Sequence, residues 1–256
     1  MQPESNFQLE LSASELYWLA SAFGQLRLPL IENPFAGLTS SRLQAVLDEG
    51  QASLQQRRLI QRQPGAGWQV ERVAAALTRW LTEPENVIVI EVHQQDGTKR
   101  RAIAYHREDV ALFMEESTPM RFTLHSKAPG LLSSIEAFLN IMADSNIPAE
   151  DLQIIQPEYL LPLTWYSPKS AVTVLERAGL SHNEATGVTS RLEKITGTAL
   201  LTSYKLEGNT MHTTDRQIIL WRDEGCWAGE ISDDGLNTIP FHSSESLHNF
   251  LESQLY

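Results

Sequence analysis

Residues 199–256, ALLTSYKLEGNTMHTTDRQIILWRDEGCWAGEISDDGLNTIPFHSSESLHNFLESQLY, decide the fold predicted for this chain. Segments rich in β-branched and aromatic residues predict four strands, at Ala199–Glu207, Arg216–Arg222, Cys226–Ser232 and Leu236–His242. Turn-forming residues separate these strands at Gly208-Asn209, Asp223-Glu224-Gly225 and Asp233-Asp234-Gly235. The last segment opens with a serine cap signal and places Leu247, Phe250 and Leu251 at helical spacing, which predicts a closing helix.

The same order of elements occurs earlier in the chain. Four strands are predicted at Val87–His93, Lys99–Arg107, Val110–Glu115 and Met120–His125, followed by a helix at Gly130–Met142. We interpret the two series as a divergent internal repeat, with pseudo-repeat halves 1–145 and 146–256 in a single domain, 1–256. The boundary is expected within Asn146–Pro157, where Pro148 and Pro157 flank an acidic pair.

Each half is also expected to begin alike, with a short strand and covering helices. The first half has a predicted strand at Phe7–Leu11 and helices at Glu15–Phe23, at Ser40–Ile60 with an interruption near Gly50, and at Val70–Leu81. The second half has a strand-into-helix pattern at Leu152–Leu161 and helices at Ser170–Ala178 and Asn183–Ile195. Strand meanders covered by helices predict an α+β fold.

Composition limits the classes of function. The net charge is −12, and acidic residues outnumber basic ones by 17 to 13 in residues 1–145 and by 15 to 7 in 146–256, which disfavours a nucleic-acid partner. The single cysteine, Cys226, excludes a disulfide framework. The sequence shows neither a secretion signal nor an apolar stretch of roughly 18 residues, so we predict a soluble, cytoplasmic protein without membrane insertion.

The sequence carries no recognised catalytic or phosphate-binding motif, and we predict no enzyme, cofactor or metal. His93, His106 and His125 could meet on adjacent strands as metal ligands, but we expect three solvent-exposed histidines. Asp223 and Glu224 would raise the pKa of the Cys226 thiol, which favours a structural thiol over a nucleophile. Asp233-Asp234-Gly235 is interpreted as a hairpin turn, not a calcium loop.

One basic segment keeps a second function open. Arg57, Arg58 and Arg62, with Trp68, follow a helix and precede a glycine turn, which superficially resembles the end of a winged-helix unit. The alternative is therefore a DNA-binding or transcription-related protein that acts through residues 40–72.

Several stretches resemble the EspG family of ESX (type VII) secretion-associated chaperones. These are FQLELSASELYWLASAFGQLRLPL, LQQRRLIQRQPGAGWQVERVAAALTRWLTEPENVIVIEV and TDRQIILWRDEGCWAGEISDDGLNTIPFHSSESLHNFLESQL. The resemblance implies a pseudo-twofold fold with a central, mostly antiparallel sheet and helical bundles. Around the last strands the chain departs from the family's pattern, with Cys226 where a basic residue is usual.

The resemblance also implies a role and a site. The role is that of a chaperone that shields a helical, aggregation-prone secreted protein or protein pair without ATP. The family's contact loop would correspond here to Gln94, Gln95, Asp96, Gly97 and Thr98, with Lys99 and Arg100 at its edge. The family's second contact, a helical bundle, would correspond to Ser170–Ile195. Such a role needs an exposed surface of the order of 1,000 Å², not a set of reacting groups.

Overall fold

A computed structural model describes most of the chain. The described residues are 7–25, 28–65, 67–94, 96–107, 110–125, 128–141, 153–154, 168–177, 179–192, 195–207, 210–222, 225–232, 235–241 and 244–254. The predicted boundary at Asn146–Pro157 therefore lies outside them, except for the two residues of strand β8.

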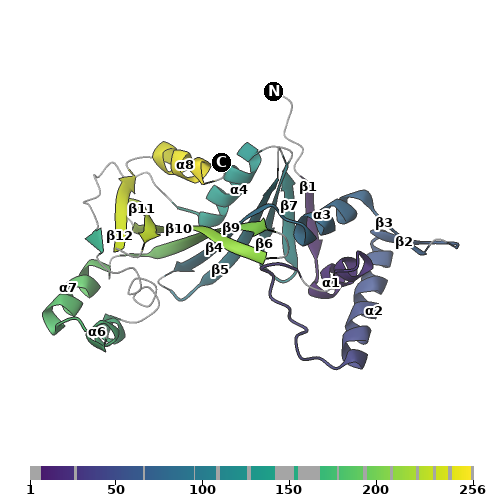
Figure 1. Cartoon of the computed structure of the whole chain (residues 1–256), viewed down its shortest axis with the longest axis horizontal. Helices are drawn as coiled ribbons and strands as arrows, with labels where there is room; N and C mark the ends of the chain where they lie inside the picture. The colour runs from purple at the N-terminus through teal and green to yellow at the C-terminus, as the bar shows by residue number, and fades with distance from the viewer. Residues whose placement is uncertain are drawn as a thin grey trace. The chain divides into compact units, whose positions relative to one another are not determined.

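Helices and strands alternate in blocks along the chain (Figure 1). The helices are α1 (Ala13–Ala22), α2 (Ser40–Gln56), α3 (Arg72–Thr82), α4 (Ala128–Leu139), α6 (Pro168–Arg177), α7 (His182–Leu192) and α8 (Ser244–Ser253). The strands are β1 (Phe7–Leu11), β2 (Ile60–Gln63), β3 (Gly67–Val70), β4 (Asn86–Gln94), β5 (Lys99–Arg107), β6 (Val110–Glu115), β7 (Met120–His125), β8 (Gln153–Ile154), β9 (Gly197–Glu207), β10 (Thr210–Arg222), β11 (Gly225–Ser232) and β12 (Gly235–Phe241).

Ten strands form one sheet in the order β1-β7-β6-β5-β4-β9-β10-β11-β12-β8, and β2 pairs with β3 in a separate hairpin. Every pairing whose register is given is antiparallel. The predicted α+β class with an antiparallel sheet is thus confirmed. The strand order is the same from either edge of the sheet. One edge is the short strand β1, followed by the four strands of the first meander in reverse order (β7 to β4), and the other is the short strand β8, followed by those of the second in reverse order (β12 to β9). That the halves 1–145 and 146–256 are copies of one duplicated sequence stays a prediction.

The chain divides into two compact units built from interleaved segments. Unit 1 comprises Met1–Val87, Ile103–Leu131 and Lys205–His212, and unit 2 comprises Ile88–Ala102, Leu132–Tyr204 and Thr213–Tyr256. Among the described residues, no helix has the length and apolar character needed to cross a bilayer.

In unit 1, α1 supplies the main apolar face. Ser12 caps the helix through a reciprocal capping box with Glu15. Leu16 and Leu19 are completely buried, and α1 packs against α2 and α3. Buried apolar residues on β6 and β7, among them Phe113 and Phe122, contribute to the core of the same unit.

Helix α2 corrects one prediction, because it runs through Gly50 without a break. A Cβ atom at this position would lie 2.3 Å from the backbone oxygen of Ser14. Gly50 therefore serves the close approach of α1 and α2, and it is not a helix stop. The strands β2 and β3 were missed by the sequence prediction, which assigned Ile60 and Val70 to helices.

In unit 2, the β10–β11–β12 meander carries buried side chains such as Ile219 and Trp227. The pairing of Ser232 with Gly235 confirms a hairpin there, although Asp233 and Asp234 lie outside the described residues. Helices α4 and α8 lie side by side, and His248 contacts Glu136 with 2.8 Å between Nδ1 and Oε1 (Figure 1).

Cys226 is buried in β11, and burial raises the pKa of its thiol to about 12. Since the thiolate is the reactive form, we expect no reaction with a thiol reagent at pH 8 while the protein is folded. The measurement is labelling by 5,5′-dithiobis(2-nitrobenzoate) with and without guanidinium chloride. Rapid labelling of the native protein would contradict the buried placement.

Candidate functional site

The predicted contact loop is the turn that joins β4 to β5 in unit 2. Its closure is a backbone hydrogen bond of 2.9 Å from the Gln94 N–H to the Thr98 carbonyl. Gly97 has φ +88°, a conformation that glycine adopts without steric cost, and its N–H donates to the Gln94 carbonyl. We call residues 94–100 the hairpin tip.

Asp96 orders the turn from its exposed position. Its Oδ1 accepts a hydrogen bond of 2.8 Å from the Thr98 N–H. This backbone hydrogen bond, followed by one from the Thr98 side chain, holds the pKa of Asp96 below its ordinary value. The carboxylate is therefore ionised at neutral pH and fixes the shape of the tip.

The predicted site residues differ in how they are presented. Asp96, Gly97, Thr98 and Lys99 are exposed, Gln94 and Arg100 are half-buried, and Gln95 lies outside the described residues. The guanidinium of Arg100 lies over the ring of Phe138, 4.8 Å from its centroid. Arg100 therefore stabilises the packing of β5 against α4 through a cation–π contact, and Lys99 is the more accessible cation.

The second predicted contact consists of α6 and α7, which pack against each other. A hydrogen-bond contact of 2.7 Å between His182 Nδ1 and Glu176 Oε1 joins the two helices on their exposed side. Glu184 accepts hydrogen bonds from Ser181 at the start of α7, and these hold the pKa of Glu184 below its ordinary value. The helical pair is thus confirmed, and its role in binding stays a prediction.

The candidate histidines do not form a metal site. His125 is 1% exposed and His93 and His106 are half-buried, so the expectation that all three are solvent-exposed is wrong. They lie on β4, β5 and β7, and the sequence pattern alone did not reveal how far each is covered. Burial is the first cause that lowers the pKa of His93, and the nearby Lys99 lowers it further. Within the described ranges, no three histidine, cysteine or acidic side chains are grouped as metal ligands.

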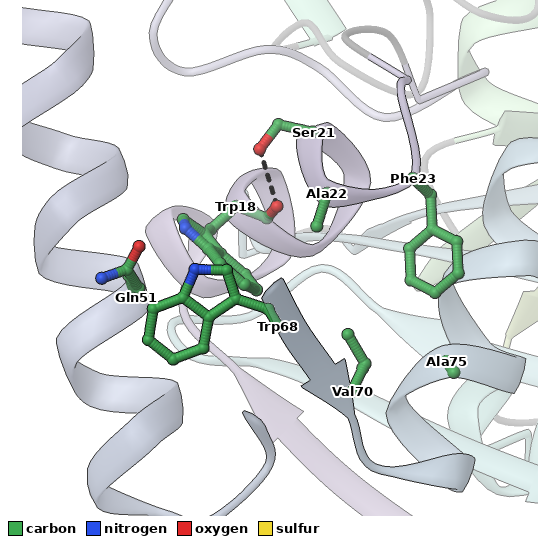
Figure 2. A pocket seen from close by; sticks show the side chains of 8 residues that line it. All are labelled: Trp18, Ser21, Ala22, Phe23, Gln51, Trp68, Val70 and Ala75. Atoms are coloured by element: carbon green, nitrogen blue, oxygen red, sulfur yellow. Dashed lines mark hydrogen bonds between the residues drawn. The ribbon is translucent and has the colours of Figure 1, made fainter. Parts of the chain in front are cut away.

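A second feature, in unit 1, was missed by the sequence analysis. An open cleft of about 550 Å³ lies between α1, α2, β3 and the start of α3. Figure 2 shows the indoles of Trp18 and Trp68 on one side of the opening and the ring of Phe23 on the other. The two indoles meet edge to face, with 5.8 Å between ring centroids. We call this feature the tryptophan cleft, which is lined by Trp18, Ser21, Ala22, Phe23, Gln51, Trp68, Val70 and Ala75.

Some residues of the basic segment considered for DNA binding make contacts within unit 1. The Arg57 guanidinium contacts both carboxylate oxygens of Glu15 at 2.8 Å and donates to the Glu10 carbonyl at 2.7 Å. Trp68 packs against Trp18. Arg58 and Arg62 remain exposed on the surface of the unit.

Comparisons with known proteins give a likeness in fold. No protein-family model matches the sequence, and no curated protein matches it. Among solved structures, the chain is similar to the Mycobacterium tuberculosis type VII secretion system chaperone EspG5 in complex with a PE25–PPE41 dimer. The two chains superpose with a TM-score of 0.59 at 10% sequence identity, over 96% of this chain and 95% of the other. This chain therefore has an EspG5-like fold.

Proposed function

We propose that this chain is a non-enzymatic binding protein with a chaperone role, which shields a helical, aggregation-prone secreted protein or protein pair. The observation that carries the proposal is the likeness to EspG5 over nearly the whole of both chains, in a structure where that chaperone holds a PE25–PPE41 dimer. Because the likeness covers nearly the whole of both chains, it supports the idea that loops on the surface of the sheet occupy similar positions in the two proteins.

The hairpin tip supports this role physically. Its hydrogen bonds hold Asp96, Gly97 and Thr98 in one exposed turn before any partner is present. Ordering a loop on binding costs conformational entropy, so a loop that is already ordered keeps more of its interaction energy as affinity. The carboxylate of Asp96 and the ammonium of Lys99 can form charge-assisted hydrogen bonds with a partner.

The direct experiment mixes the purified chain with helical secreted pairs. The PE25–PPE41 dimer is one probe, and a pair of small helical secreted proteins encoded beside this chain's gene is the second. We expect a stable complex with at least one pair in size-exclusion chromatography, and less light scattering when that pair is heated together with this chain. If neither pair forms a complex, the proposed function is wrong.

Replacing Lys99 with glutamate is expected to weaken such a complex about tenfold, which corresponds to about 1.4 kcal/mol. The side chain is exposed at the hairpin tip, so the change alters its charge without opening the core. Isothermal titration calorimetry gives the dissociation constant. Lys205→Glu is the matched control, because Lys205 is an exposed lysine on β9 whose ion pair with Glu207 is long, at 4.0 Å. Equal affinities for the two variants would remove the hairpin tip from the binding surface.

Duplex DNA binding through residues 40–72 is the second candidate function. The structure has helix α2 followed by the β2–β3 hairpin, the order that the winged-helix interpretation requires. Of the three arginines considered for DNA contact, Arg57 is already paired with Glu15 and is therefore less suited to bind a phosphate. DNA binding that weakens steeply as salt is raised, and that Arg58→Glu abolishes, would favour this function over the chaperone.

A further inference from the structure

We propose that the tryptophan cleft is a docking site for a short, acidic, amphipathic segment of another protein, which inserts one large apolar side chain between the indoles and Phe23. The proposal concerns unit 1 alone and does not depend on the hairpin tip or on the chaperone role. Three observations carry it: the apolar lining, the chemistry of the β2–β3 hairpin faces and the charges at the rim.

The lining is apolar and partly exposed. Phe23 is 42% exposed, which makes it one of three large hydrophobic side chains exposed among the described residues. The cleft volume of about 550 Å³ falls within the range of roughly 300–1,000 Å³ that is typical of ligand pockets. An aromatic or long aliphatic side chain would remove this apolar surface from water.

The β2–β3 hairpin presents two different faces. Side chains of directly opposed residues share a face of an antiparallel pair, and Arg62 lies opposite Trp68 while Ile60 lies opposite Val70. The face with Trp68 and Val70 lines the cleft. The other face carries glutamines and a glycine, namely Gln61, Gln63, Gln69 and Gly67. Only the first face is therefore suited to an apolar anchor, and it brings the guanidinium of Arg62 to the same side.

Two arginines give the rim a positive charge. Arg62 stands beside Trp68, and Arg72 lies three residues before the cleft residue Ala75 on α3, so that both belong to one side of that helix. Neither arginine makes an ion pair within the described residues, and no acidic side chain lines the cleft. Two acidic residues stand near the cleft in sequence. Glu71 caps α3 by accepting hydrogen bonds from the Val73 and Ala74 N–H groups, and Asp48, three residues before Gln51 on α2, accepts one from the Gln44 side chain.

Polar donors complete the match to a peptide. Trp18 is only 7% exposed, lines the cleft and has no hydrogen-bond partner for its indole N–H in the part of the chain that the structure describes. Gln51 of α2 lies beside the two indoles (Figure 2). These donors suit the carbonyl groups of a peptide backbone, while Arg62 and Arg72 suit its carboxylates. In a chain with a net charge of −12, such a local positive rim would select an acidic segment against the field of the rest of the surface.

The test uses three labelled helical peptides that share one pattern of leucines with a single tryptophan. The first has glutamate at its polar positions, the second has lysine there, and the third keeps glutamate but has serine in place of the apolar anchors. Fluorescence anisotropy with the full chain is expected to give a micromolar dissociation constant for the first peptide and values at least about tenfold weaker for the others. Equal binding of the glutamate and lysine peptides would overturn the proposal, and so would no binding of the glutamate peptide.

Variants then locate the site on the protein. Arg62→Glu and Phe23→Ser are each expected to weaken the glutamate peptide at least about tenfold, and both residues are exposed enough for the fold to tolerate the change. Arg42→Glu is the matched charge control, since Arg42 lies in the first turn of α2, more than two turns from Gln51, and should change affinity less than about twofold. If Arg62→Glu and Arg42→Glu behave alike, the cleft is not the site. If duplex DNA binds and displaces the peptide in an Arg62-dependent manner, the surface recognises phosphates and the proposal is also overturned.

Discussion

Replacing Gly50 with alanine is expected to lower the free energy of unfolding by about 3 kcal/mol, at the upper end of typical overpacking effects. The added Cβ would lie 2.3 Å from the Ser14 oxygen and 2.9 Å from the Glu15 nitrogen, and both are backbone atoms of α1 that have no rotamer to change. The helices would have to separate along an interface that buries Leu16 and Leu19. Alanine is the better helix former by about 1 kcal/mol, so the steric cost must exceed that gain.

The matched control is Gly187→Ala in the interior of α7. A Cβ atom at Gly187 would meet nothing within 4 Å. Here only the helix preference acts, and we expect stabilisation by about 0.5–1 kcal/mol. Urea unfolding followed by circular dichroism measures both changes. If Gly50→Ala is neutral or stabilising, α1 and α2 do not approach as closely as described.

Replacing Arg57 with alanine is expected to destabilise the protein by about 2–3 kcal/mol, because it leaves the Glu15 carboxylate buried without its counter-charge. The Glu15 side chain is 3% exposed, whereas the Arg57 side chain is 37% exposed, so the effect should fall below that of a fully buried pair. The change also removes the donor that covers the Glu10 carbonyl on the edge strand β1. Thermal or urea unfolding gives the difference.

The double variant Glu15→Gln with Arg57→Ala is the control, and it should recover part of the loss because no charge remains buried. The pH dependence gives a second check. Burial alone would raise the pKa of Glu15, but hydrogen bonds from Ser12, Ser53 and Arg57 outweigh it and hold the pKa below its ordinary value. Glu15 therefore stabilises the fold at neutral pH, and this stability is lost as the pH falls through its lowered pKa. If the Arg57→Ala variant were as stable as the parent protein, the ion pair between Arg57 and Glu15 would not stabilise the fold.

Local sequence patterns were sufficient for much of the fold. Segments rich in β-branched and aromatic residues, separated by turn residues, located both meanders. The helix predicted at Glu15–Phe23 corresponds to α1, which begins two residues earlier, at Ala13. The turn between β4 and β5 lies between the strands predicted at Val87–His93 and Lys99–Arg107. These features depend on residues that are close together in the sequence, so they can be read from one sequence.

Features that depend on distant contacts were not predictable. Gly50 reads as a helix interruption until its contact with Ser14 is known, and Arg57 reads as a surface cation until Glu15 is found beside it. The strands β2 and β3 are four residues each, too short for a clear alternation. Trp18 and Trp68 are fifty residues apart, and no local pattern shows that they share a cleft. The only signal was their size, because large aromatic residues are frequent at binding surfaces.

Amide hydrogen exchange at the hairpin tip tests the central claim most directly. The chain should be measured alone and when saturated with a helical secreted pair that forms a complex with it. We expect the amides of residues 94–100 to exchange more slowly in the complex, because a docked partner excludes water from them. Unchanged exchange at these amides under saturation, with protection confined to other surfaces, would contradict the assignment of the hairpin tip as the surface that holds the partner.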